Sequence, residues 1–211
     1  MNLSQKLIKD CKKLKKLNLI LSGGNSPLKD YKNLFKAKLN WKDIDLYLSD
    51  ERLVKINNKQ SNFFNINKIL KENNLEKKLK PINKIFLQKK KIMKILNNIK
   101  KKPTIAVLGM GEDGHFGSIF LKSKKYKLLT DTSKSPYIYK TEPLGSPKVE
   151  RVTMNLSMFL LSSKIYLILN NKKKINLYKK ANISLNTRTI PICSLIKASK
   201  KITIIKNLSD K

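Results

Sequence analysis

The chain of 211 residues suits one domain, taken here as residues 1–211, and its 40% hydrophobic content excludes a disordered polymer. Two cysteines, Cys11 and Cys193, lie near opposite ends, which excludes a disulfide framework and a cysteine-based zinc motif. No apolar run approaches the roughly 18 residues that span a bilayer. These features predict a cytoplasmic protein that neither spans nor binds a membrane.

The formal net charge of +33 raises the hypothesis of a basic nucleic-acid-binding protein. The basic residues, however, are spread along the whole chain, and only Arg52, Arg151 and Arg188 are arginine among the 47. Lysine, asparagine and isoleucine are all abundant, as in proteins from AT-rich genomes. We therefore interpret the charge mainly as solvated lysine with a general preference for anionic ligands, and expect no specific nucleic-acid partner.

In chain order, helical and strand patterns alternate. The N-terminal residues have leucines and Cys11 on one helical face and lysines on the other. The elements predicted in the first half are helices over residues 3–15, 27–37 and 61–70, with Ser61 as a cap, and strands over 17–21 and 44–48.

The second half continues the alternation. The predicted strands are 85–87, 104–108, 152–156, 165–169 and 202–205, and the predicted helices are 91–99, a short one from about His115, a helical turn after residue 156, and 172–181. This order predicts an α/β class, single-domain, three-layer Rossmann-like fold with a mostly parallel sheet flanked by helices. In such sheets ligands bind at the carboxyl ends of the strands.

The first motif, Ser22-Gly23-Gly24-Asn25-Ser26-Pro27, lies between a predicted strand and a predicted helix. Glycines let backbone N–H groups turn inward, and a helix N-terminus adds partial positive charge, so the segment suits an anion. A tight turn with a helix cap explains the same residues equally well.

The second motif, Asp50-Glu51-Arg52, follows a predicted strand and precedes Ser61-Asn62. An arginine can bind a phosphate through two parallel hydrogen bonds, which lysine cannot do. Because lysine is the usual basic residue in this chain, an arginine at position 52 indicates that the planar guanidinium geometry is needed there. The alternative is an Asp–Arg pair on the surface.

The third motif, residues 108–118, holds the only histidine, His115, in a glycine-rich loop after a strand. Imidazole is well matched to general base catalysis near pH 7. Either Glu112 or Asp113 would be near enough in sequence to orient it. The loop also spells the dinucleotide pattern G-x-G-x-x-G, with Asp131 about 20 residues later, but its two carboxylates would repel a pyrophosphate.

Arg151, within Pro147–Met154, opens a predicted strand, and Lys172-Lys173-Lys174 opens a predicted helix. One of these lysines is in a position to reach a phosphate at a strand end. A solvated lysine run accounts for the others.

Together and in this order, these segments resemble the 6-phosphogluconolactonase family of the glucosamine-6-phosphate isomerase superfamily. The resemblance covers roughly residues 17–181 and rests on LSGGNSP, WKDIDLYLSDERLV with Ser61-Asn62, VLGMGEDGHFGSIF, SPKVERVT and NNKKK. It implies hydrolysis of 6-phosphogluconolactone in the pentose phosphate pathway, with no metal and no organic cofactor.

The resemblance also implies roles. His115 would activate water, with Asp113 and Asp50 in the catalytic group. Substrate binding would fall to Ser22, Gly23, Gly24, Ser26, Arg52, Gly111, Arg151 and Lys174. The sole partner expected is the phosphorylated sugar lactone, and the expected state is a monomer or weak homodimer.

Several positions depart from the family pattern. Ser26 replaces threonine, Phe116-Gly117 replaces Thr-Ala, Leu121 replaces proline and Asn171 replaces glycine. The deaminase branch would need a glutamate shortly after the histidine, and no acid follows His115 until Asp131. A non-catalytic sugar-phosphate-binding homologue stays open as an alternative.

Overall fold

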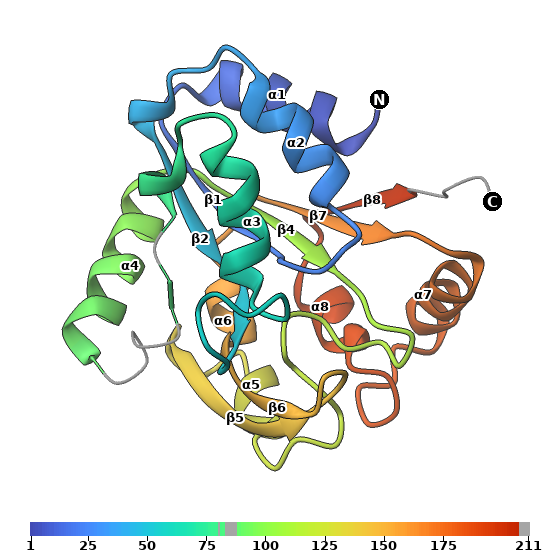
Figure 1. Ribbon diagram of the computed structural model, residues 1–211. Helices are drawn as coiled ribbons and strands as arrows, with labels where there is room; N and C mark the ends of the chain where they lie inside the picture. The colour runs from blue at the N-terminus through green and yellow to red at the C-terminus, as the bar shows by residue number, and fades with distance from the viewer. Residues whose placement is uncertain (80, 83–87, 207–211) are drawn as a thin grey trace.

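The computed structural model describes residues 1–79, 81–82 and 88–206, and its centre is a five-stranded sheet in the order β2-β1-β4-β7-β8 (Figure 1). Every neighbouring pair in this sheet is parallel. The carboxyl ends of all five strands therefore lie at one edge. The strands are β1 (Leu17–Leu21), β2 (Ile44–Leu48), β4 (Thr104–Gly109), β7 (Lys164–Leu169) and β8 (Ile202–Lys206).

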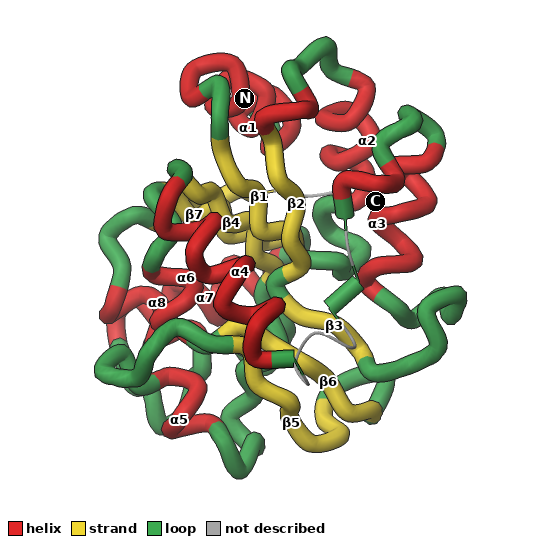
Figure 2. The backbone as a smooth tube through the Cα atoms, turned by 90° about the vertical axis from the view of Figure 1, so that its left-hand side faces the viewer, coloured by secondary structure: helices red, strands yellow, loops and turns green. Residues whose placement is uncertain are grey.

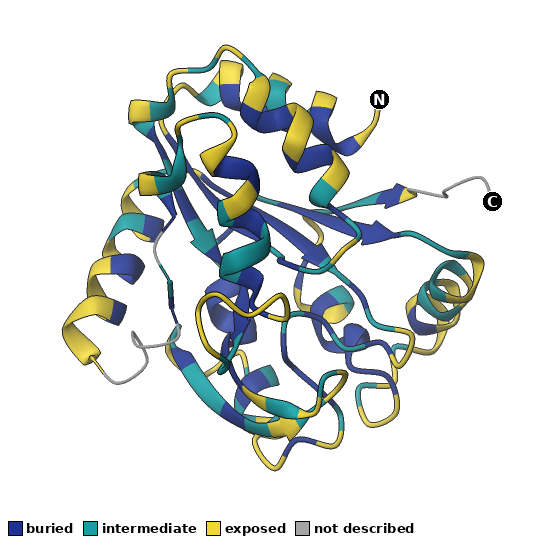
Figure 3. Ribbon diagram, viewed as in Figure 1, coloured by how far each residue is buried: buried dark blue, intermediate teal, exposed yellow. Residues whose placement is uncertain are grey.

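Helices cover both faces of this sheet. Figures 1 and 2 show α1 (Leu3–Leu14), α2 (Leu28–Lys36) and α3 (Asn62–Lys71) on one side, and α4 (Lys89–Lys101), α6 (Leu156–Leu160) and α8 (Ile192–Ala198) on the other. Because both faces are covered, the inner strand β1 is buried along its whole length, including its one polar residue, Asn18. The amphipathic helices pack their apolar faces against the sheet, and these buried faces are dark blue in Figure 3.

The remaining helical segments lie between strands. They are α5 (Tyr126–Thr130), α7 (Lys172–Ser184) and two short 3₁₀ helices, Trp41–Asp43 and Glu76–Lys78. Three of the longer helices begin at side-chain caps: Asn2 for α1, Ser61 for α3 and Asn171 for α7. These helix starts agree with the boundaries expected from the sequence.

A second sheet, which the sequence did not predict, extends from the carboxyl edge of the first. It is antiparallel, in the order β3-β6-β5, with β3 at Asp50–Arg52, β6 at Val149–Met154 and β5 at Ile138–Leu144. Ser49 joins the sheets, because its N–H donates to Leu21 O at 3.0 Å and its carbonyl accepts from Met154 N at 3.0 Å. Asp50-Glu51-Arg52 is thus a strand rather than a loop after one.

Two other sequence-based boundaries were wrong. No helix begins at His115; residues 111–125 form turns and isolated bridges, because Gly114 and Gly117 have φ of +83° and +53°, outside the helical region. The strand expected over 152–156 begins earlier, at Val149, and ends at Met154, because Asn155 caps α6. The strand expected over 85–87 lies outside the described residues.

The fold class is confirmed: a parallel sheet between two helical layers. Within the described part of the chain, no helix is both long and apolar enough to cross a membrane. Both cysteines are buried and free.

Candidate active site

A cleft of about 330 Å³ opens at the carboxyl edge of the parallel sheet. The loops after β1, β4 and β7 form one part of its wall, and strands β3 and β6 form another. Its lining residues are Ser22, Gly24, Asn25, Ser26, Asp50, Arg52, Asn62, Gly109, Met110, Gly111, His115, Gly117, Arg151, Asn170 and Lys174. Of the eleven residues expected at the site, only Gly23 and Asp113 are missing from this lining.

The histidine loop is tightly closed. Gly111 N donates to His115 O at 2.8 Å, and His115 Nδ1 lies 2.5 Å from Asp113 Oδ1. A Cβ on Gly111 would lie 2.1 Å from His115 Nδ1 and 2.6 Å from Asp113 Oδ1. Gly111 is therefore required for space beside the imidazole. Its N–H already has an acceptor in the loop itself.

Asp113, rather than Glu112, is the carboxylate at His115. Partial burial acts to raise the pKa of Asp113, but hydrogen bonds from His115 and the charge of the imidazolium outweigh this effect, and the pKa is lowered. Glu112 instead accepts from Asn171 Nδ2 at 3.1 Å. An ionised carboxylate only accepts hydrogen bonds, so Nδ1 of neutral His115 carries the proton, and Nε2 is the nitrogen able to accept one.

Phe120, which the sequence reading did not single out, supports the imidazole from the side. The ring centroids of His115 and Phe120 are 4.1 Å apart with an interplanar angle of 31°. The guanidinium carbon of Arg151 lies 5.3 Å from the centroid of the same Phe120 ring. One aromatic side chain thus packs against both the candidate base and a candidate phosphate ligand.

Arg52 and Arg151 are direct cross-strand partners in the antiparallel sheet. Residues paired in this way have Cβ atoms about 5 Å apart on the same face, and like charges there repel. Both arginines line the cleft. An anion bound between them would remove this repulsion.

The guanidinium group of Arg151 is held in place by backbone carbonyl groups. The residue is only 3% exposed, and it donates from Nε to Leu144 O and from Nη2 to Pro147 O, each at 2.9 Å. Burial lowers its pKa, with the nearby Arg52 charge acting in the same direction and Asp50 opposing. Arg52 donates from Nη1 to Gln60 O at 2.8 Å, and its buried Nε has no partner.

Asp50 lies in the cleft wall with both carboxylate oxygens engaged. Oδ1 accepts from Ser49 Oγ and Oδ2 accepts from Ser118 Oγ, each at 2.7 Å. Asp50 is 5% exposed. These contacts suit a carboxylate that fixes the local geometry and offsets the two arginine charges.

The structural role of Glu51 was not expected from the sequence. Its carboxylate accepts from Asn62 N, Phe63 N and Arg52 N, each at 2.7 Å, and from Ser61 Oγ at 2.9 Å. Burial raises its pKa, and these hydrogen bonds oppose the increase. Glu51 therefore joins the start of α3 to the strand that carries Arg52, a task typical of a carboxylate at a helix N-terminus.

At the opposite wall, Lys174 reaches the cleft from the first turn of α7. Partial burial lowers its pKa, while the Glu112 charge opposes this change. Asn171, where glycine is usual in the family pattern, accepts Lys174 N at 2.8 Å as the helix cap. That substitution is thus explained by capping.

The Ser22–Ser26 loop contributes Ser22, Gly24 and Ser26 to the lining, but Gly23 faces α3. A Cβ on Gly23 would lie 2.3 Å from Asn62 Cβ. Gly23 therefore permits close packing against Asn62, a role different from the substrate contact expected for it.

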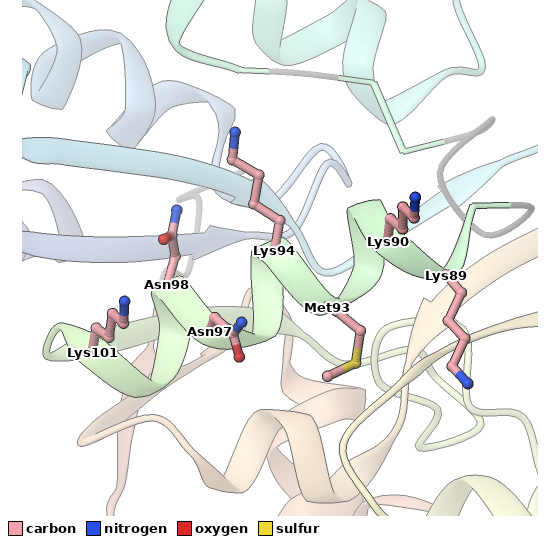
Figure 4. Close-up of a pocket in the computed structure, with 7 residues that line it drawn as sticks. All are labelled: Lys89, Lys90, Met93, Lys94, Asn97, Asn98 and Lys101. Atoms are coloured by element: carbon pink, nitrogen blue, oxygen red, sulfur yellow. The ribbon is translucent and has the colours of Figure 1, made fainter.

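Elsewhere in the described residues, other candidate sites are less well formed than this cleft. No group of three or more His, Cys, Asp or Glu within the described ranges is arranged to hold a metal ion. A hollow of about 720 Å³ on α4 is lined by that helix alone, and Figure 4 shows Lys89 and Lys94 pointing to opposite sides. The dinucleotide alternative also fails, because no helix starts at the third glycine of its pattern.

The comparison with protein families agrees with this geometry. Residues 2–204 match the family model described as glucosamine-6-phosphate isomerases/6-phosphogluconolactonase. The chain belongs to this family.

Among curated relatives, the 6-phosphogluconolactonase of Thermotoga maritima is 34% identical over 76% of this chain and 72% of its own length. That of Helicobacter pylori strain J99 is 28% identical over 91% of this chain and 83% of its own. The crystal structure of a 6-phosphogluconolactonase from Shewanella baltica is 26% identical, with a TM-score of 0.78 over 97% of this chain and 90% of that one.

Proposed function

We propose that this chain is a hydrolase that opens 6-phospho-D-glucono-1,5-lactone to 6-phospho-D-gluconate in the pentose phosphate pathway. The observation that supports this most is a cross-strand arginine pair in the same cleft as a carboxylate-oriented histidine. The names of the relatives in the shared family point to the same substrate.

The phosphate end of the substrate is assigned to the arginine wall. Arg52 and Arg151 present two guanidinium groups, and the loop after β1 adds the hydroxyls of Ser22 and Ser26. Lys174 contributes a further positive charge. A dianionic phosphate has only acceptor oxygens, so this set of donors suits it.

The reacting end of the substrate is assigned to His115. Neutral His115, with Nδ1 bound to Asp113, takes a proton through Nε2 from a water molecule as the water attacks C1 of the lactone. Attack forms a C–O bond and places negative charge on the carbonyl oxygen. That oxyanion then collapses, the ring C–O bond breaks, and the leaving oxygen takes a proton from the imidazolium.

Binding and chemistry are linked through geometry. The phosphate contacts orient the ring so that C1 faces His115, which lowers the entropic cost of reaching the transition state. Because Gly111 N already bonds within the loop, it is not a free donor for the oxyanion.

The test is hydrolysis of freshly generated 6-phosphogluconolactone, coupled to 6-phosphogluconate dehydrogenase, with the spontaneous rate subtracted. We expect clear acceleration, and a far lower kcat/KM for unphosphorylated gluconolactone. Binding of 6-phosphogluconate without any acceleration would contradict the proposal and favour a non-catalytic sugar-phosphate-binding protein.

The remaining sequence-based expectations belong to the same proposal. We propose a single domain over residues 1–211, acting as a cytoplasmic monomer or weak homodimer without a specific nucleic-acid partner. The buried, free cysteines are compatible with a reducing compartment. Sedimentation analysis would test the assembly state.

A further inference from the structure

The cleft contains hydrogen-bonding atoms of two opposite kinds that have no partner. Arg52 Nε is a buried donor, whereas Asn62 Oδ1 and Asn170 Oδ1 are buried acceptors. All three residues line the cleft. A buried polar atom without a partner costs free energy, so such atoms concentrated in one cleft indicate groups that a ligand supplies.

Asn62 is the better defined of the two acceptors. The residue is 2% exposed, and its Nδ2 donates to Asp50 O at 2.8 Å. Turning the amide over would place Oδ1 against the Asp50 carbonyl, so that two acceptors would face each other. The orientation is therefore fixed, and the free atom is the oxygen.

The position of Asn62 is also fixed from two further sides. Its backbone N–H donates to Glu51 Oε1 at 2.7 Å, and its Cβ packs against Gly23 so closely that no side chain fits there. An acceptor held in this way loses little entropy when a donor arrives. Capping of α3 does not explain its amide, because Ser61 Oγ provides the side-chain cap through Phe64 N.

The proposed substrate narrows what that donor is. A dianionic phosphate, a lactone carbonyl and a ring oxygen all accept hydrogen bonds and donate none. Only the hydroxyl groups of the sugar donate. We propose that Asn62 Oδ1 accepts a hydrogen bond from the hydroxyl at C2, C3 or C4 of the bound sugar phosphate, groups that the lactone and 6-phosphogluconate share, which makes Asn62 a specificity-determining residue; this inference rests on the proposed function.

The chain contains a matched control. Asn67 lies on the same helix and also has a buried amide oxygen without a partner, but it does not line the cleft. Asn62→Leu and Asn67→Leu remove the same chemical group from the same helix. An effect caused by weakening α3 would appear in both variants.

The experiment is calorimetric titration of wild type and both variants with 6-phosphogluconate and, separately, with inorganic phosphate. We expect Asn62→Leu to weaken 6-phosphogluconate binding by about 5- to 100-fold, the loss of one well-placed hydrogen bond, while phosphate binding changes by less than about twofold. We expect Asn67→Leu to bind both ligands as wild type does. Equal weakening of both ligands by Asn62→Leu, or no weakening, would overturn the inference.

A second measurement needs no variant. Wild type is titrated with 6-phosphogluconate analogues that each lack one of the hydroxyls at C2, C3 or C4. Loss of affinity confined to one analogue supports the inference, and uniform affinity across the series overturns it. If wild type hydrolyses no lactone but keeps this pattern, the proposed hydrolysis fails and the role of Asn62 stands.

Discussion

The cleft has two unlike walls. The glycine-rich loop after β4 carries His115 and Asp113 at the edge of the parallel sheet, and the small antiparallel sheet carries Arg52 and Arg151. In the first wall, glycines make room for one imidazole. In the second, strand pairing forces two cations together. We propose a division of labour, with chemistry at the first wall and phosphate binding at the second.

The largest effect is expected from the chemical wall. His115→Ala removes the proposed base, so kcat should fall by about 10²–10⁴-fold while KM changes little. Steady-state kinetics of lactone hydrolysis, with the spontaneous rate subtracted, measures both constants. A change confined to KM, with kcat unaffected, would contradict the assignment of the catalytic base to this wall.

Gly111→Ala tests the same wall without removing the base. The added methyl would lie 2.1 Å from His115 Nδ1, so the imidazole must move. A displacement of about 1 Å is expected to lower kcat by roughly 10²-fold. Gly24→Ala is the comparison: a Cβ there has no protein atom within 4 Å and lies in the binding part of the cleft, so it should leave kcat much closer to wild type even if KM changes.

Arg151→Lys tests the binding wall. Lysine keeps the charge but loses the hydrogen bonds to Leu144 O and Pro147 O that aim the guanidinium. We expect KM to rise by about 10- to 100-fold with a smaller change in kcat. The same substitution at exposed Arg188 is the control, and it should leave both constants near wild type.

The smallest effect concerns stability. The pKa of Asp113 is lowered in the folded protein, so the carboxylate stabilises the fold above the ordinary aspartate pKa, and this contribution is lost as pH falls through the lowered value. Since 60% of the Asp113 side chain is exposed, Asp113→Asn should cost less than about 1 kcal/mol near pH 7.

Urea unfolding of wild type and Asp113→Asn between about pH 7 and pH 2 measures this difference. The two proteins should converge at the acid end. A difference that grows as pH falls would show that the sign is wrong.

The two walls also differed in how far the sequence predicted them. The parallel strands follow from short apolar runs between helical patterns, and their shared carboxyl edge follows from the parallel order. That reasoning brought Ser22, His115 and Lys174 to one place. It failed in the His115 loop, where Gly114 and Gly117 adopt positive φ and prevent a helix. The sequence alone does not show which glycines adopt positive φ.

The antiparallel sheet could not be predicted from the sequence, for a physical reason. β3 is three residues long and mostly polar, so it has no strand periodicity, and it pairs with β6 about 100 residues later. Arg52 and Arg151 were each singled out, but their pairing depends on that long-range register. The contacts of Glu51, Asn62 and Phe120 likewise arise only when distant segments meet.

The most direct test of the division of labour is titration of 6-phosphogluconate into the His115→Ala variant. The lactonase rate is measured on the same protein sample. The account predicts that the dissociation constant stays within about threefold of wild type although hydrolysis falls to near the spontaneous rate. Loss of binding in proportion to the loss of rate would contradict it, because the two walls would then not act separately.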